Sequence, residues 1–187
     1  MKAIFNLGFG LLTLIFAFFV ITPENVFAQT EIRILPVSTS EVQTSLLDED
    51  QLINMSVGLQ QFFLQELQNI GNVGELSREH ILLLMKEMPP PDIDNLTEEE
   101  YKKICKMEEL KYLLKCSIES LNIVDKNILI PVNIVIINGK NGKEFWQKEI
   151  TINQLKPKQQ LTEHILLTEI FKPALAESVK EMKKLKY

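Results

Sequence analysis

Cysteine and histidine are scarce in this sequence, with two residues of each among 187. Two cysteines do not make the disulfide framework that staples small secreted domains, and Cys105 and Cys116 are not spaced as a C-x-x-C pair. A zinc site needs three or four ligands at compact spacing. His80 and His164, each alone on a predicted helix, do not supply them. We therefore predict no metal site and no cofactor.

The signatures of common catalytic sites are also missing. No G-x-S-x-G nucleophile elbow occurs, and residues 71–74 lack the third glycine or the lysine of a phosphate-binding loop. Ser77 lies near His80, but a serine there is better explained as a helix N-cap. Residues 48–50 are acidic, yet they lack the glycine and the downstream glutamate of a calcium loop. We expect a non-enzymatic protein with no catalytic residues.

The one long apolar run lies at the N-terminus. Lys2 precedes an apolar stretch from Leu7 to Ile21, and residues 26–28 place small side chains at alternate positions, as a signal peptidase requires. The run is shorter than the about 20 residues that span a bilayer. We predict a cleavable secretory signal with the cut between Ala28 and Gln29.

The predicted division is a signal peptide over residues 1–28 and one mature domain over residues 29–187. Neither cysteine lies at the end of the apolar run, so the lipid-attachment residue of a bacterial lipoprotein is missing. We therefore expect a periplasmic or secreted protein; if the leader is retained, it tethers the domain to the inner membrane. Removal of Lys2 and Glu24 leaves the formal net charge at −5. An acidic protein repels polyphosphate, which argues against a nucleic-acid partner.

Periodicity predicts an α/β domain with elements in the order β-α-β-α-α-β-β-β-α. Residues 31–37 alternate as a strand. Asp50 is the predicted N-cap of a helix whose apolar residues recur every three or four positions up to Ile70. A short strand follows over residues 73–76.

Two further helices are marked by their caps. Ser77 caps a helix that the prolines at 89–91 end. Thr97 and Glu100 form a capping box, which begins the next helix. A last helix is predicted over residues 159–184, with Pro173 interrupting it.

Three strand-like stretches separated by turn residues predict an antiparallel meander; they are residues 111–124, 128–137 and 144–152. The middle stretch is apolar on both faces, which favours a central position. Pro131 cannot donate a ladder hydrogen bond, so a bulge or a sheet edge is expected there. A shift of apolar phase between Ile118 and Leu121 indicates a second bulge. Interleaved helices and strands then predict a single layered domain, a mixed sheet with helices packed on it.

Four segments, in this order and spacing, resemble the TolB amino-terminal-like and curli-secretion-lipoprotein-like superfamily of bacterial envelope domains, a group that includes the cell-wall synthase activator LpoB. They are residues 32–37 (IRILPV), 59–87, 107–118 (MEELKYLLKCSI) and 132–146 (VNIVIINGKNGKEFW). The resemblance implies a periplasmic module that binds other proteins or assembles with copies of itself. It supplies no shared catalytic residues. The chain has no spare length for the membrane-crossing hairpins of the curli channel, so no pore is expected.

The expected function is protein-protein interaction or assembly in the cell envelope, within transport, secretion or cell-wall machinery. The partner is an envelope protein or a second copy, and membrane contact is at most peripheral. The docking surface is predicted on an exposed sheet face or at a sheet edge near Pro131. The alternative is a small-molecule or glycan-binding protein that uses a groove between helix and sheet. Cys105 and Cys116 form a possible disulfide, since a pair in an oxidising compartment often bridges, yet both also fit core positions.

Overall fold

The computed structural model describes residues 31–39, 42, 44, 46–85, 92–155 and 161–187. The predicted signal peptide, its cleavage between Ala28 and Gln29, and the prolines at 89–91 lie outside the described residues. No helix among the described residues is long and apolar enough to cross a membrane.

The described chain forms one α/β domain around a six-stranded mixed sheet, as predicted. β5 pairs antiparallel with β6 along its whole length, so β3 and β4 share its other side. β1 continues the sheet parallel to β3, and β2 lies parallel to β1 at the outer edge. The strands are β1 (Glu31–Ile34), β2 (Asn72–Glu75), β3 (Tyr112–Ile118), β4 (Asn122–Val124), β5 (Asn127–Asn138) and β6 (Glu144–Leu155).

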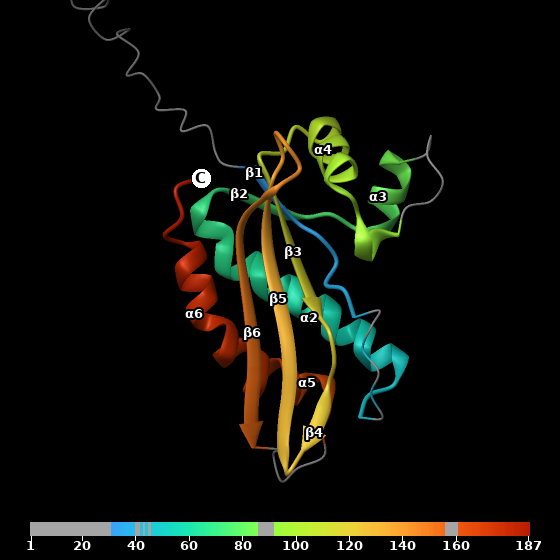
Figure 1. Cartoon of the computed structure of the whole chain (residues 1–187), viewed down its shortest axis with the longest axis vertical. Coiled ribbons are helices and arrows are strands. Elements are labelled where there is room, and N and C mark those ends of the chain that lie inside the picture. Colours follow the sequence, from blue (N-terminus) through green and yellow to red (C-terminus); the bar gives the residue numbers. More distant parts are fainter. Residues whose placement is uncertain (1–30, 40–41, 43, 45, 86–91, 156–160) are drawn as a thin grey trace, which may run out of the picture.

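Helices lie on both faces of this sheet (Figure 1). One face packs against α2, the π-helical segment η3 and α6, which enclose the larger core with Phe63 and Phe171 at its centre. The other face packs against α3 and α4, which enclose a smaller core. The helical elements are α2 (Glu49–Leu67), η1 (Gln68–Ile70), α3 (Arg78–Leu84), η2 (Ile93–Asn95), α4 (Glu98–Met107), α5 (Glu163–Ile165), η3 (Leu166–Phe171) and α6 (Lys172–Met182).

The N-cap of α2 is Asp48, so the prediction of Asp50 was wrong. The Gln51 backbone N–H donates to the Asp48 carboxylate at 2.9 Å, and the Asp48 N–H donates to the Gln51 side-chain oxygen at 3.1 Å. This reciprocal pair is a capping box with glutamine at its fourth position. Asp50 lies in the first turn, where the helix dipole favours a carboxylate.

The other predicted caps are confirmed. The Ser77 hydroxyl accepts from the His80 N–H at the start of α3. At the start of α4, the Thr97 hydroxyl accepts from the Glu100 N–H, while the Glu100 carboxylate accepts from the Thr97 N–H at 2.7 Å. The predicted third helix therefore begins where its capping box places it.

The meander is confirmed, β5 is central, and Pro131 lies beside an irregularity of the expected kind. Ile118 pairs with Val132 and Asn122 with Leu129, so the β3–β4 side has one residue more than β5 between these two pairs, which is a bulge opposite Pro131. The pairing of Pro131 with Thr151 is in regular register. The Pro131 carbonyl accepts from the Glu119 N–H at 3.1 Å. The Pro131 nitrogen, which carries no hydrogen, faces the same side of β5 as this carbonyl. On that side the chain has left β3 and has not yet entered β4. The bulge expected after Ile118 is confirmed as this same extra residue, at the break between β3 and β4. Because no strand pairs with β5 at that point, the proline removes no ladder hydrogen bond.

The C-terminal helical segment is continuous but irregular. A π-helical turn over η3 precedes Pro173, which occupies the first turn of α6. Proline is tolerated in a first turn because its missing N–H is not needed there. The predicted interruption therefore takes the form of a widened turn in place of a sharp break.

Candidate interaction surface and helix-sheet cleft

The two faces of the sheet are covered to different extents. On the face that packs against α4, Val135 and Ile137 of β5 are buried. Leu129, Pro131 and Asn133 lie further along β5 on this face and are only partly buried. In Figure 1 this half of the sheet lies in front, with α2 and α6 behind it and α4 beyond its upper end. No described helix covers it.

We call this uncovered half the open face. It comprises Asn122 and Val124 of β4, Asn127, Leu129, Pro131 and Asn133 of β5, and Glu149, Thr151, Asn153 and Leu155 of β6. Val124 of β4, Asn127 of β5 and Leu155 of β6 lie side by side across the three strands, at the end of the open face. The two outer residues of this row are apolar. Val124 is 48% exposed and Leu155 is 77% exposed. Single exposed apolar side chains also occur on α2 and α3, at Ile53, Val57 and Leu83. The open face differs from those positions because its apolar residues lie beside the edge of a sheet.

β6 adds a free edge to the open face. It is 12 residues long and, among the described elements, pairs only with β5. A strand of this length at an edge presents a row of backbone N–H and C=O groups to which another extended chain can pair. The register shift lies at Phe145, which packs on Tyr112 and Tyr187 at the start of the strand. The rest of β6 pairs in regular register.

A cleft lies between the first turn of α4 and the sheet. Its volume is about 480 Å³, within the 300–1,000 Å³ range typical of ligand sites. The helix supplies one wall, β3 and the β5–β6 hairpin supply two others, and β5 forms the floor. The lining residues are Leu96, Glu98, Tyr101, Lys115, Asn133, Val135, Ile137, Gly142, Lys143 and Glu144.

Tyr101 is the buried polar residue of this cleft. Its side chain packs in the smaller core and is only 7% exposed. Burial, together with the nearby carboxylates of Glu100, Glu144 and Asp94, raises the pKa of its phenol to about 12. Its hydroxyl has no hydrogen-bond partner among the described residues and retains contact with the cleft. A neutral donor therefore faces the cavity at every physiological pH.

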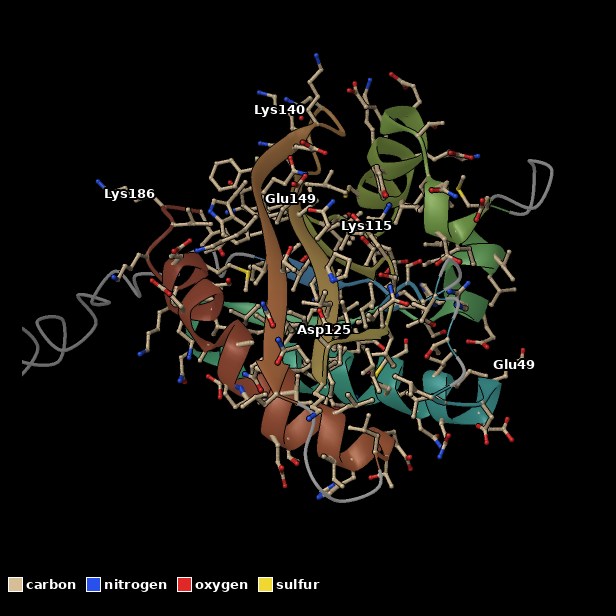
Figure 2. The ribbon with its side chains drawn as sticks, turned by 60° about the horizontal axis from the view of Figure 1, so that its bottom comes forward. Glu49, Lys115, Asp125, Lys140, Glu149 and Lys186 are labelled. Atoms are coloured by element: carbon tan, nitrogen blue, oxygen red, sulfur yellow. The ribbon has the colours of Figure 1, made fainter. Side chains whose placement is uncertain are left out.

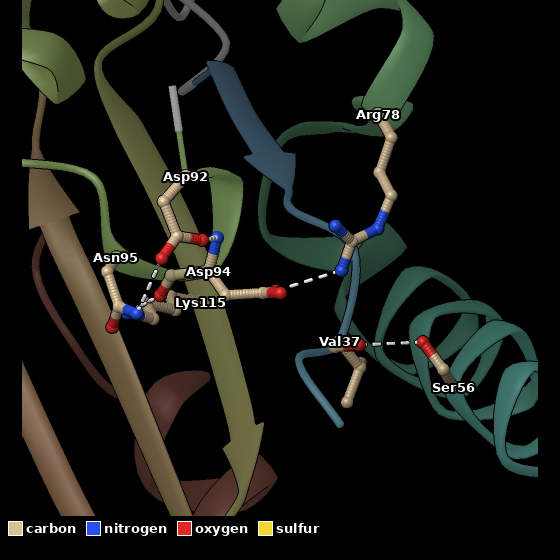
Figure 3. A network of polar contacts seen from close by, with 7 residues as sticks. All are labelled: Val37, Ser56, Arg78, Asp92, Asp94, Asn95 and Lys115. Atoms are coloured by element: carbon tan, nitrogen blue, oxygen red, sulfur yellow. Dashed lines mark hydrogen bonds and ion pairs between the residues drawn. The ribbon is translucent and has the colours of Figure 1, made fainter. Parts of the chain in front are cut away.

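The neighbouring turn η2 is held against the sheet by a polar network (Figure 3). Lys115 Nζ donates to the Asp94 backbone oxygen at 2.8 Å. The guanidinium of Arg78 forms an ion pair with the Asp94 carboxylate at 2.8 Å. Asp92 accepts from the Asn95 side chain at 2.9 Å, and these bonds hold the pKa of the Asp92 carboxyl below its usual value, chiefly through Asn95. The network fixes the mouth of the cleft.

A second cavity, of about 490 Å³, lies at the other end of α4. Lysines surround it, namely Lys102, Lys106, Lys111 and Lys140. Figure 2 shows Lys140 at the tip of the β5–β6 hairpin. Lys106 lies in the last turn of α4, where cations complement the helix dipole. That complementarity accounts for part of the basic cluster.

The structure separates the residues of the possible disulfide. Cys105 belongs to the smaller core beneath α4, whereas Cys116 lies in the larger core on the opposite face of the sheet. Both thiols are buried and free. Burial raises the pKa of each thiol to about 12. The fold therefore does not bring the two together, and the sheet stands between them.

The two histidines lie apart from both cavities. His80 contacts the Glu108 carboxylate at 2.9 Å on the surface, and His164 lies in α5. Among the described residues, no group of three or more histidine, cysteine, aspartate or glutamate side chains is placed to hold a metal ion.

The sequence predicts part of this surface but does not indicate Tyr101. The exposed sheet face near Pro131 was expected, and a groove between helix and sheet was expected in the alternative. Tyr101 was not singled out, because a tyrosine on the apolar stripe of an amphipathic helix is indistinguishable from a core residue in sequence. Only the fold shows that it lines a cavity.

This mixed-sheet α/β fold occurs in several solved bacterial proteins. The hypothetical protein CT253 from Chlamydia trachomatis matches with a TM-score of 0.51 and 11% identity, over 83% of this chain and 96% of that chain. A protein described as a neuraminyllactose-binding hemagglutinin homolog from Helicobacter pylori matches with a TM-score of 0.50 and 8% identity, over 83% and 87%. The LpoB C-terminal domain from Salmonella enterica matches with a TM-score of 0.45 and 13% identity, over 67% and 84%.

At these identities the likeness concerns the fold alone. LpoB, which the sequence resemblance included, is among the matching structures, and the resemblance to the TolB and curli superfamily stays a prediction. No family model matches the chain. No curated protein matches it in sequence.

Proposed function

We propose that this chain is an exported, non-enzymatic domain of the bacterial envelope that binds another envelope protein at its open face. The observation that carries the proposal is the exposure of Val124 and Leu155 beside the unpaired edge of β6. The predicted signal peptide supports the location.

The chemistry of the surface favours an extended segment of the partner as the docked element. Main-chain hydrogen bonds to β6 provide affinity that does not depend on sequence. Apolar side chains of the added strand then contact Leu155, and its polar side chains meet Thr151 and Asn153 on the same face. Burying one exposed aliphatic side chain contributes about 1.5–3 kcal/mol.

The test is cross-linking in the native host, followed by reconstitution with the captured protein. We expect one dominant envelope protein, and we expect Leu155→Asp to abolish its binding, because Leu155 lies on β6 beside the free edge. Val57→Asp is the control, because Val57 is also exposed, at 51% against 77% for Leu155, but lies on α2, away from the open face. A chain that is captured alone contradicts the proposal, as does equal loss of binding in both variants.

A further inference from the structure

The cavity at the C-terminal end of α4 carries an excess of positive charge. Its lining holds four lysines, Lys102, Lys106, Lys111 and Lys140, and one acidic residue, Glu109. The chain as a whole has a formal net charge of −5, so the local charge is opposite in sign to that of the protein. We propose that this cavity binds a phosphate monoester, an activity beyond the proposed protein docking.

The lysines come from three separate parts of the fold. Lys102 and Lys106 belong to α4, Lys111 precedes β3, and Lys140 lies at the tip of the β5–β6 hairpin (Figure 2). The dipole of α4 explains a cation in the last turn of that helix, which is Lys106. It does not explain Lys111 and Lys140, which the fold brings to the same cavity.

Most of these lysines have no ion-pair partner in the described part of the chain. Lys102 lies 3.7 Å from the Glu99 carboxylate. Among the residues that the structure describes, Lys106, Lys111 and Lys140 form no ion pair. Ammonium groups around one cavity repel each other, and an anion bound between them offsets that repulsion.

The carbonyl groups at the end of α4 are paired within the backbone. The Glu108 N–H donates to the Ile104 carbonyl at 3.0 Å, and the Leu110 N–H donates to the Cys105 carbonyl at 2.8 Å. The chain turns back at Glu109, which has a φ of 55°. Because backbone donors already engage these carbonyl oxygens, they do not neutralise the lysines.

The frame that carries the lysines is tightly built. A Cβ atom at Gly139 would lie 2.5 Å from the Leu110 carbonyl oxygen and 2.8 Å from the Cys105 Cβ. The Gly139 N–H donates to the Lys111 carbonyl at 2.8 Å. The hairpin, the end of α4 and the start of β3 are thus held together, which reduces the entropy that a ligand must remove on binding.

The lysines favour a phosphate over a carboxylate. No arginine is among the described lining residues, and arginine is the residue whose planar fork matches a carboxylate. An ammonium group acts as a point charge, so its attraction grows with the charge of the ligand. A phosphate monoester carries about −1.5 to −2 near pH 7, whereas a carboxylate carries −1. The cavity volume of about 490 Å³ also leaves room for an organic group, beside Tyr112.

The test is a calorimetric titration of the protein, purified as its host delivers it, with phenyl phosphate and with benzoate. The two probes share an aromatic ring and differ in charge. We expect phenyl phosphate to bind at least about fivefold more tightly than benzoate. Absence of saturable binding of phenyl phosphate overturns the proposal, as does equally tight binding of benzoate.

Two matched variants place the binding. Lys140 and Lys143 are both exposed in the β5–β6 turn, but Lys143 lines the cleft at the first turn of α4. We expect Lys140→Met to lower the affinity for phenyl phosphate about fivefold, and Lys143→Met to lower it less than about twofold. Equal losses would reveal only a general effect of charge and would overturn the site.

A phosphate monoester can be a soluble ester or the headgroup of a lipid such as phosphatidate. Sedimentation with phosphatidylcholine vesicles that contain or lack phosphatidate distinguishes the two sources. Binding to the phosphatidate vesicles alone, with displacement by phenyl phosphate, supports the cavity and identifies a lipid headgroup as its ligand. Binding of phenyl phosphate by a protein that stays free of both vesicles supports the cavity and identifies a soluble ester.

Discussion

Gly142 lies so close to the Glu98 carbonyl oxygen that a Cβ atom at Gly142 would overlap it. This contact joins the β5–β6 hairpin to the first turn of α4 and closes one side of the cleft. Gly142 also has a φ of +73°, a conformation that other residues adopt only with strain. The approach of hairpin to helix therefore requires glycine for two separate reasons.

Gly142→Ala is expected to lower the free energy of unfolding by about 2 kcal/mol or more, from backbone strain and overlap together. Gly74→Ala is the control, since its Cβ would meet only the flexible Arg33 side chain at 3.2 Å. There we expect a change below about 1 kcal/mol. Urea unfolding measures both, and equal effects would contradict the assigned role of Gly142.

Asp48→Ala is expected to destabilise the protein by about 1 kcal/mol, because the capping box of α2 loses its acceptor. Asp50→Ala removes only a first-turn carboxylate, for which we expect about 0.5 kcal/mol. Thermal unfolding of the two variants distinguishes them. A larger loss of stability in Asp50→Ala than in Asp48→Ala would contradict Asp48 as the N-cap and support the Asp50 that the sequence indicated.

Because Cys116 is buried, we expect the free energy of unfolding to fall at high pH. Its folded pKa is raised by burial from 9.0 to about 12. Between these values the unfolded chain releases the thiol proton while the folded chain keeps it, so stability falls as the pH rises through this window. The contribution of one such thiol is at most about 1.4 kcal/mol per pH unit.

Urea unfolding from pH 8 to pH 11 measures that slope. We expect Cys116→Ala to be less stable than the wild type at pH 8, through lost packing, but to show a shallower decline. Parallel curves for the two proteins would show that the thiol ionises equally well in the folded state.

Both thiols are expected to be free and protected. Iodoacetamide should modify neither Cys105 nor Cys116 in the folded protein, because both are buried and their pKa values are raised. After unfolding in urea without reductant, mass spectrometry should detect two modified cysteines. Detection of none would reveal the disulfide that the sequence leaves open.

The sequence predicts this fold best where short stretches decide the structure. The Ser77 and Thr97 caps depend on residues three positions apart, and both are confirmed. The turn at Asp125 and Lys126 is confirmed as well, with φ angles of 49° and 71° typical of a tight hairpin. These features depend only on residues a few positions apart in the sequence, so they can be predicted without knowing which distant segments lie nearby.

Other features depend on distant parts of the chain, and the sequence does not show them. The extra residue of the bulge lies opposite Pro131 and not in β5 itself, which follows from where β3 ends and β4 begins on the neighbouring side of β5. The separation of Cys105 from Cys116 follows from which face of the sheet each one meets. The place of Tyr101 in the lining of a cavity follows from how α4 meets the sheet. Tertiary contacts decide all three.

The position of β1 constrains the order in which this domain forms. β1 lies between β2 and β3, with registers that pair Ile32 with Val73 and with Tyr112. A chain delivered N-terminus first presents β1 long before either neighbour exists. β5 and β6, in contrast, are joined by a short turn and can pair as soon as both are delivered, because hairpins close in microseconds. In a chain delivered N-terminus first, β1 therefore keeps at least one edge without its native partner until β3 has been delivered, that is, until residue 118.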